Sequence, residues 1–193
     1  MSYPDFTLRL PEWVAPFIAE QGQFYPTAEA RMRLVIKLAQ KNVAMQTGGP
    51  FGAAIFNMET HQLIAPGVNL VVPQNCAILH AEMVAITIAQ QILGSFDLGA
   101  AHLPDCELVA STEPCAMCFG AVPWSGAKRL VCGARDEDAR AIGFDEGPKL
   151  PNWQETLQAR GIEVWRDVCH EEAAAVLQQY AATSGLIYNG RGS

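Results

Sequence analysis

The chain has no long apolar segment. None of its uninterrupted apolar runs approaches the roughly 18 residues of a transmembrane helix. Residues 1–17 include Asp5, Arg9 and Glu12, so they lack the apolar centre of a secretory signal peptide. We therefore expect a cytoplasmic protein with no membrane partner.

Positive charge is also scarce. The 193 residues include 13 Lys and Arg against 20 Asp and Glu, which gives a formal net charge of −7. Nucleic-acid-binding proteins usually carry a basic patch, because neutralising phosphates supplies much of their affinity. The thin spread of basic residues predicts no nucleic-acid partner and favours a small neutral substrate, with a local basic groove as the alternative.

Repeats, linkers and low-complexity segments are missing too. The chain has 16 glycines and 12 prolines, and 50% of its residues are hydrophobic, which is typical of globular proteins. This length suffices for one domain with a full core. We expect a single domain over residues 1–193, with an aromatic-rich N-terminal arm at 1–26 and a C-terminal tail at 184–193.

Hydrophobic spacing predicts alternating helices and strands. Thr27 is expected to cap a helix over 28–46, where apolar residues recur every three or four positions. A hairpin of strands at 51–56 and 63–72 should follow, with a polar turn between them. Further helices are expected at 12–21, 80–93, 115–124, 136–141, 153–159 and 171–183, and further strands at 106–111, 129–133 and 162–165.

This order of elements indicates an α/β fold. Helix–strand alternation in the second half of the chain favours parallel crossovers after an antiparallel start. We predict a three-layer α/β/α sandwich whose mixed sheet is mostly parallel after an N-terminal hairpin.

The most informative pattern consists of one histidine, one glutamate and two cysteines. His80 and Glu82 lie two residues apart, and Pro114 precedes Cys115 and Cys118. Cysteines three residues apart share one face of a helix, and proline suits the start of a helix. A first helical turn also favours the thiolate form. Two thiolates and a neutral imidazole balance the charge of Zn²⁺ and leave a fourth position for water, which predicts a catalytic zinc site.

Glu82 is not needed as a ligand. A carboxylate beside the water can take its proton and return it to the substrate, and the order H-x-E then P-C-x-x-C is the zinc-deaminase signature. The alternatives for the cysteine pair are a redox pair or half of a structural zinc site, but a closed site needs four ligands. The other four cysteines are expected to be small buried hydrophobic residues, namely Cys76, Cys106, Cys132 and Cys169.

Beyond these motifs, residues 50–147 resemble the cytidine deaminase superfamily and, within it, the small bacterial guanine deaminases most. The resemblance is carried by Gly49-Pro50-Phe51-Gly52-Ala53, Asn69, the two zinc motifs and Ile142-Gly143-Phe144-Asp145-Glu146. It implies a cytidine deaminase-like fold, a Zn²⁺ cofactor and a homodimer in which C-terminal segments exchange. The zinc motifs indicate the superfamily, whereas the similarity to guanine deaminases, and so the expected substrate, depends on residues 142–146.

The resemblance assigns the zinc ligands to His80, Cys115 and Cys118, and the proton shuttle to Glu82. Its other implied roles concern the substrate. Asn69 matches a residue that hydrogen-bonds the purine edge, with a turn asparagine as the alternative.

Further substrate contacts are implied by the same resemblance. Phe51 matches an aromatic pocket wall, with a plain core residue as the alternative. Glu146 matches a second acid that is often Asp in similar enzymes, so Asp145 is the fallback candidate, and a solvated acidic loop is the alternative for both. Tyr188 is the candidate to close the pocket of the partner subunit, and Trp124 is expected to pack under the site.

We therefore expect zinc-dependent hydrolysis of guanine to xanthine and ammonia, a reaction of purine metabolism with a small purine base as partner. Glu82 would deliver the proton of the water to N3, and Glu82 and Glu146 would help protonate the leaving amine. Alternative substrates are tRNA adenosine, cytosine compounds and other aminated heterocycles such as triazines. A non-catalytic zinc- or purine-binding module, including an inactive relative that keeps zinc for structure, is the alternative from a different class.

Overall fold

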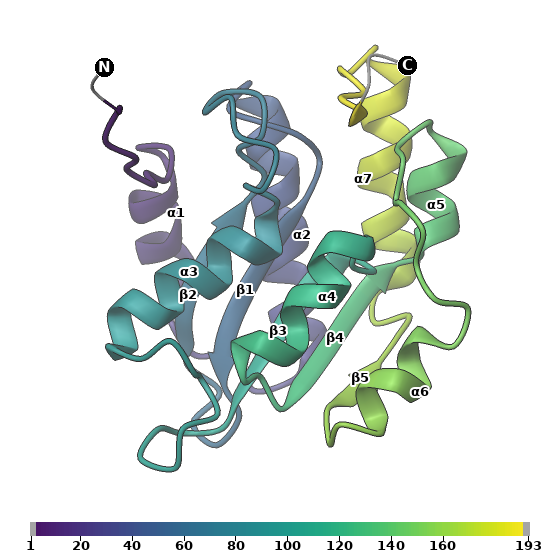
Figure 1. Ribbon diagram of the computed structural model, residues 1–193. Coiled ribbons are helices and arrows are strands. Elements are labelled where there is room, and N and C mark those ends of the chain that lie inside the picture. Colours follow the sequence, from purple (N-terminus) through teal and green to yellow (C-terminus); the bar gives the residue numbers. More distant parts are fainter. Residues whose placement is uncertain (1–2, 191–193) are drawn as a thin grey trace.

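A mixed β-sheet forms the middle layer of the protein in a computed structural model that describes residues 3–190 (Figure 1). Its strands lie in the order β2-β1-β3-β4-β5. They are β1 (Gly52–Asn57), β2 (Leu63–Val68), β3 (Cys106–Thr112), β4 (Arg129–Ala134) and β5 (Glu163–Trp165). Strand β1 pairs antiparallel with both β2 and β3, whereas β3, β4 and β5 run parallel. The predicted hairpin and the parallel strands after it are confirmed.

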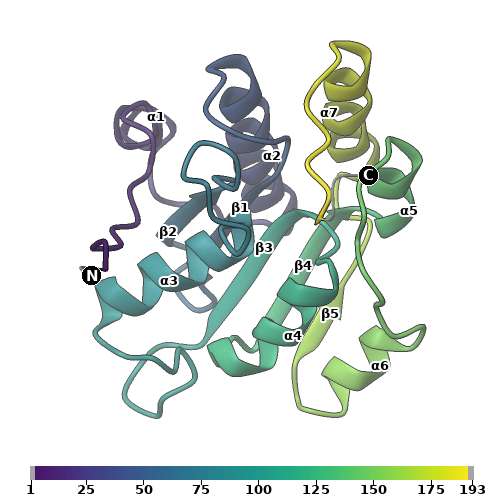
Figure 2. The ribbon, with the colours of Figure 1, turned by 45° about the horizontal axis from the view of Figure 1, so that its top comes forward.

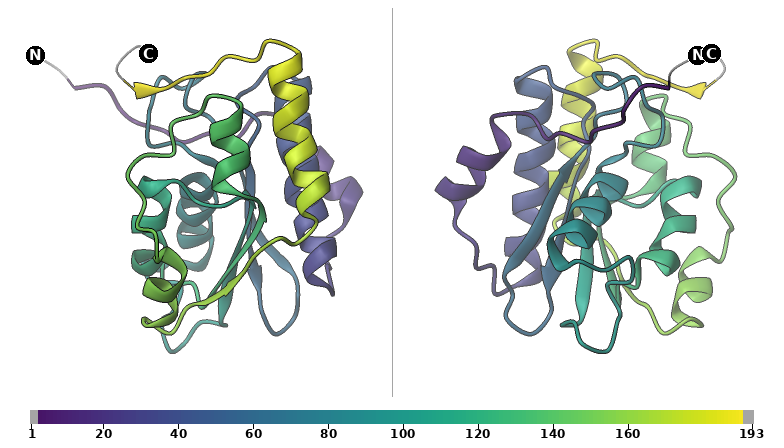
Figure 3. Two further views of the ribbon diagram at one scale, coloured as in Figure 1. Left: turned by 90° about the vertical axis from the view of Figure 1, so that its right-hand side faces the viewer. Right: turned by 60° about the vertical axis from the view of Figure 1, so that its left-hand side comes forward.

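Helices cover both faces of the sheet (Figures 1 and 3). One face carries α3 (Ala81–Leu93), α4 (Ala116–Ser125) and α6 (Trp153–Gln158), and the other carries α1 (Val14–Gln21), α2 (Ala28–Ala44) and α7 (His170–Ala182). The short helix α5 (Asp136–Ala141) lies beside α7. The predicted α/β/α sandwich is thus confirmed, and within residues 3–190 no helix is long and apolar enough to cross a membrane.

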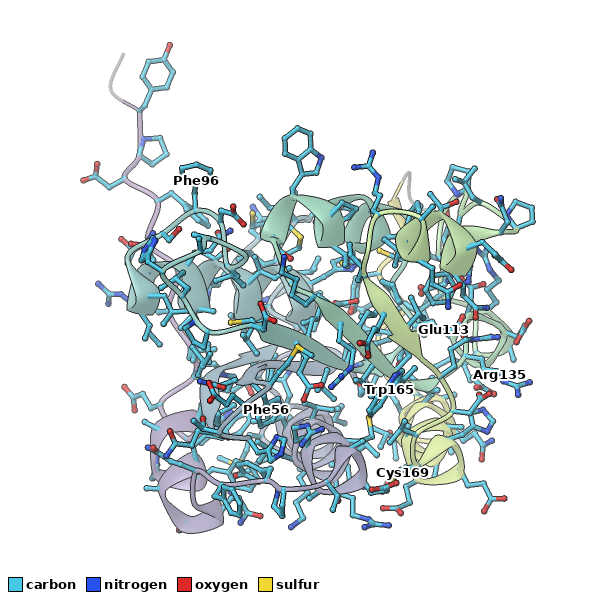
Figure 4. All side chains as sticks on the ribbon, turned by 90° about the horizontal axis from the view of Figure 1, so that it is seen from below. Phe56, Phe96, Glu113, Arg135, Trp165 and Cys169 are labelled. Carbon is cyan, nitrogen blue, oxygen red and sulfur yellow. The ribbon has the colours of Figure 1, made fainter. Side chains whose placement is uncertain are left out.

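Alternate residues of the strands enter two separate apolar cores. On β1, Ala54 and Phe56 pack toward α2, whereas Ala53 and Ile55 pack toward α3. Figure 4 shows Phe56 on the side of the sheet that faces α2. Because both faces are covered, every residue of the central strand β3 is buried, including the polar Glu107, Ser111 and Thr112.

Helix starts and ends follow local chemistry. The Thr27 side chain accepts a hydrogen bond from the Ala30 backbone N–H at 3.1 Å and caps α2, as predicted. Gly94 has φ +66° and ends α3 in the left-handed conformation. Strand β2 ends at Val68, four residues earlier than expected, because the Asn69 side chain accepts from the Val71 N–H at 3.3 Å and turns the chain.

Gly67 allows α3 to lie close against β2. A Cβ at this position would stand 2.2 Å from the Ala81 carbonyl oxygen and 2.6 Å from the Ala85 nitrogen. We predict that Gly67→Ala lowers the free energy of unfolding by about 1–3 kcal/mol through overpacking. Because α3 starts at the predicted ligand His80, the variant should also bind zinc more weakly. Denaturant titration and metal analysis measure both effects.

Gly120, in the exposed part of α4, provides the matched control. A Cβ there meets no atom within 4 Å outside its own helix. Gly120→Ala should therefore keep its zinc and gain up to about 1 kcal/mol, since alanine is the better helix former. Equal stability of Gly67→Ala and the wild type would contradict the close-contact argument.

Candidate active site

Two helix N-termini bring three metal-binding side chains together. His80 is the N-cap residue of α3, and Cys115 is the N-cap residue of α4, with Cys118 in its first turn. The candidate ligand atoms of the three residues all lie within 4.8 Å of one another, and Cys115 Sγ is 3.5 Å from His80 Nδ1. Both cysteines are buried. The fold therefore assembles the predicted triad from segments that are 35 residues apart in the chain.

The donor chemistry of this cluster fits zinc. Tetrahedral zinc with sulfur and nitrogen ligands places neighbouring donors roughly 3.5–3.8 Å apart. Without metal, a hydrogen bond with Cys118 lowers the pKa of Cys115 to about 4, and the same bond, together with burial, raises the pKa of Cys118 well above its usual value. The two sulfurs thus share one proton, which a divalent cation would displace.

A cavity of about 160 Å³ opens beside the cluster. Seven of the nine residues predicted for the site line it, namely Phe51, His80, Glu82, Cys115, Asp145, Glu146 and Tyr188. Cys118 and Asn69 do not line it, and both are buried. The Asn69 Nδ2 atom has no hydrogen-bond partner among residues 3–190.

Sequence reasoning missed six lining residues. They are Val71, Ala77, Glu113, Phe144, Asn189 and Gly190. Glu113 and Phe144 belong to motifs that carry the family resemblance, and Asn189 follows Tyr188 directly, so proximity to those positions was the only available signal. Ala77 lies on the loop before α3, where no periodicity marks it.

Two carboxyl groups face this cavity from different segments. Glu82 is 8% exposed and Glu146 is 6% exposed. Burial and the neighbouring Cys115 thiolate raise the pKa of Glu146 to about 8, and the same two causes raise the pKa of Glu82. Without metal, both carboxyls therefore hold a proton more tightly than an exposed glutamate does.

Asp145 and Glu146 differ in their surroundings. Asp145 is exposed, and its carboxylate accepts a hydrogen bond from the Gly147 N–H at 2.9 Å. Glu146 is buried in the cavity wall, and its backbone oxygen accepts from the Ala116 N–H at 2.9 Å. Of the two neighbouring acids, Glu146 is the one enclosed beside the metal ligands.

The C-terminal tail reaches the cavity of its own chain. It leaves the end of α7 and passes over the top of the sheet (Figures 2 and 3). Tyr188 packs edge-on against Phe144 at 5.2 Å, and Phe144 packs against Phe51 at 5.0 Å. Asn189 donates to the Gly143 carbonyl and accepts from the Asp145 N–H, each at 2.9 Å. Exchange of the tail between subunits stays a prediction, because this structure contains one chain.

Trp124 does not pack under the site, and that prediction is wrong. The side chain is 86% exposed at the outer end of α4, because this turn of the helix faces away from the sheet. Cys76 is half-buried and lies outside the ligand cluster.

Residues 26–134 match the family model of the cytidine and deoxycytidylate deaminase zinc-binding region. The chain belongs to this deaminase family. It is 38% identical to guanine deaminase of Bacillus subtilis over 158 residues, which cover 75% of this chain and 97% of that protein. It is 37% identical to the tRNA-specific adenosine deaminase of Rickettsia bellii over 93 residues, or 48% of this chain and 61% of that protein.

Solved structures of this deaminase family have the same fold. A structure of guanine deaminase from Nitrosomonas europaea superposes with a TM-score of 0.87 at 45% identity, covering 94% of this chain and 99% of that one. The protein NE0047 in complex with 2,6-diaminopurine superposes with a TM-score of 0.84 at 48% identity, covering 92% and 95%. Together with the His80, Cys115 and Cys118 cluster, family membership makes Zn²⁺ the cofactor of this enzyme.

The pKa of Glu146 leads to a prediction for the metal-free protein. Its folded value, about 8, lies above its ordinary value of 4.5, so the folded state holds the proton more tightly than the unfolded state. Its contribution to stability is present below its ordinary pKa and is lost as the pH rises through about 8. We expect Glu146→Gln to flatten the fall in stability over this range.

Thermal unfolding of zinc-free protein across this pH range measures the effect. Glu82 contributes in the same direction, so the wild-type slope should shrink in Glu146→Gln without vanishing. An identical slope in both proteins would show that Glu146 titrates normally.

Proposed function

We propose that this deaminase hydrolyses guanine to xanthine and ammonia. The observation that carries the proposal is a cavity of about 160 Å³ in which two buried carboxyls, Glu82 and Glu146, stand beside the metal ligands. Its relatives in Bacillus subtilis and Nitrosomonas europaea are guanine deaminases, and NE0047 was crystallised with 2,6-diaminopurine and, as a mutant, with 8-azaguanine.

The proposed chemistry replaces the C2–N bond of the exocyclic amine with a C2–O bond from water. His80, Cys115 and Cys118 would hold the zinc ion, which when bound would lower the pKa of a water toward about 7. Glu82 takes a proton and delivers it to N3 of the ring. Glu146 donates a proton to the departing amine, which leaves as ammonia, and regains one from the C2 hydroxyl as the xanthine carbonyl forms. Both carboxyls are buried, and burial raises the pKa of each in the metal-free protein.

Binding of the base is assigned to three further side chains. The buried Asn69 amide has a donor without a partner among residues 3–190, so an acceptor on the purine edge would satisfy it. Phe51 and Tyr188 both pack around Phe144 and supply apolar walls for a flat ring. Asp145 is exposed on the loop that carries Glu146, and its hydrogen bond with the Gly147 N–H is proposed to hold the turn of that loop.

The size of the cavity supports a free base. Pockets for drug-sized ligands measure roughly 300–1,000 Å³, and this one is about 160 Å³. The tail residues Tyr188, Asn189 and Gly190 line it and would obstruct a polynucleotide. The net charge of −7 adds to the case against tRNA as substrate.

The proposal includes a single domain, a cytoplasmic location, a place in purine metabolism and a homodimer in which the tail of each subunit would take, in the partner, the place that it occupies here in its own chain. The six cysteines are all free, which suits a reducing compartment. Large apolar side chains are exposed on the α3–α4 side, including Ile92, Phe96 and Trp124, as a subunit interface would require. Phe96 stands at the outer edge of that side in Figure 4.

Ammonia release from a panel of substrates tests the proposed function. The panel contains guanine, adenine, cytosine, cytidine, a triazine and tRNA, and the zinc content of the same sample is measured. Guanine should give the highest kcat/KM. Glu82→Gln should retain zinc and lose turnover by a factor of about 10²–10⁴, the usual contribution of a general acid–base. Full activity of Glu82→Gln, or preference for another panel member, would overturn the proposal.

Tyr188 yields a separate prediction about substrate size. It lines the small cavity and also a neighbouring groove of about 830 Å³ formed by the ends of α2 and α7. Tyr188→Ala should join the two spaces, lower kcat/KM for guanine and permit measurable turnover of guanosine. Tyr188→Phe is the matched control, because the hydroxyl has no partner among residues 3–190, and its activity should stay near wild type. Unchanged selectivity in Tyr188→Ala would show that the ring is not the partition.

A further inference from the structure

The loop that carries Glu146 has no regular secondary structure, so contacts with neighbouring segments must fix its position. The Glu146 backbone oxygen accepts from the Ala116 N–H at 2.9 Å, which ties the loop to the first turn of α4. Gly147 has φ +68°, and a Cβ there would stand 3.1 Å from the Ala116 side chain. Arg140 Nη2 donates to the Gly147 oxygen at 2.8 Å.

Lys149 connects this loop to two other segments. Its side chain is 6% exposed, which is rare for lysine. Its Nζ lies 2.8 Å from Asp136 Oδ1 and 3.6 Å from Glu113 Oε2, and it donates to the Pro114 carbonyl at 3.1 Å. Lys149 therefore bridges the start of α5 and the residues that lead into the cysteine ligands.

The surrounding charges form a closed network. Arg140 pairs with Asp136, Arg166 pairs with Glu113, and the Asp136 N–H donates to Glu113 at 3.3 Å. Burial tends to raise the pKa of Asp136, but Lys149 and Arg140 lower it on balance, so the carboxylate stays charged. A buried ammonium is tolerated only when it is paired in this way, and removing it leaves buried carboxylates short of a partner.

Lys149 does not line the cavity, and its ammonium group is already engaged by Asp136, Glu113 and the Pro114 carbonyl. Its three contacts, with Asp136, Glu113 and the Pro114 carbonyl, instead fix the chain end of the Glu146 loop next to the segment that leads into the first cysteine ligand. We propose that Lys149 is a positioning residue that holds the Glu146 carboxyl beside the metal ligands. The kinetic test of this inference rests on the proposed function, whereas its structural test needs no turnover.

The kinetic test is a double-mutant cycle with Lys149→Met, Glu146→Gln and the double variant, each checked for zinc content. If Lys149 acts through Glu146, Lys149→Met should lower kcat about 10–100-fold, as misplacement of a reacting group does, with KM changed less than about 3-fold. In the Glu146→Gln background the same substitution should change kcat less than about 3-fold. Additive losses, or an effect on KM alone, would overturn the proposal.

Matched variants separate positioning from general stability. Arg135 precedes Asp136 at the start of α5. Arg135→Met breaks the exposed ion pair of this residue with Asp167 and should leave kcat unchanged. Arg135 points outward in Figure 4, whereas Glu113 lies inside. If Lys149→Met does not fold, Lys149→Gln keeps a donor for the Pro114 carbonyl without the charge. Lys149→Gln should lower kcat less than Lys149→Met does, and it should lower kcat only when Glu146 is present. If Lys149→Gln lowers kcat equally in the wild-type and Glu146→Gln backgrounds, the proposal is contradicted.

A crystal structure of zinc-loaded Lys149→Met, or of Lys149→Gln in its place, tests the inference without any turnover. The proposal expects the loop over residues 143–149 to shift and the Glu146 carboxyl to leave the cavity, while His80, Cys115 and Cys118 stay in place. An unmoved Glu146 would overturn the inference whatever the enzyme acts on. A wild-type enzyme that ignores guanine would instead refute only the proposed function.

Discussion

The convergence of two helix N-termini on one small volume is the constraint on which the rest of the structure depends. His80 precedes α3 and Cys115 precedes α4, and each helix is held by a different part of the sheet. Helix α3 lies on β2 and β1, where Gly67 permits close contact, and α4 directly follows β3. The antiparallel pairing of β1 with β3 brings these halves together. The site therefore lies at the carboxyl end of β3, next to the point where the sheet changes from antiparallel to parallel pairing, as binding sites of α/β sheets commonly do.

Charge balance explains why so many ionisable groups can be buried there. A zinc ion with two thiolates and a neutral imidazole carries no formal net charge, so Glu82 and Glu146 would be the charged groups that remain. Without metal, burial and the Cys115 thiolate raise the pKa of both carboxyls. A second group of charges, centred on Lys149, Glu113 and Asp136, is internally paired, and of these three only Glu113 also lines the cavity. The protein thus separates groups suited to moving protons from groups that hold the backbone in place.

Most of the helices and strands, and the candidate metal ligands, could be predicted from the sequence, because local patterns of neighbouring residues mark them. The Thr27 cap and the spacing of Cys115 and Cys118 are of this kind. The features that sequence could not supply depend on distant contacts. Choosing Glu146 over Asp145 required the contact of the Glu146 backbone with Ala116 in the first turn of α4 and the burial of its side chain. The exposure of Trp124 follows from how α4 rotates on the sheet. Lys149 gives no sequence signal, since its partners Glu113 and Asp136 come from separate segments.

The central claim is that His80, Cys115 and Cys118 hold one zinc ion and leave one position open beside Glu82. Zinc-edge X-ray absorption of the purified protein, combined with metal analysis, tests it most directly. The account predicts one zinc per chain with two sulfur neighbours at about 2.3 Å and two lighter nitrogen or oxygen neighbours at about 2.0–2.1 Å. Substituting Cys118 with alanine should remove one sulfur neighbour or the metal itself. A closed shell of three or four sulfurs, or a protein that takes up no zinc, would contradict the account.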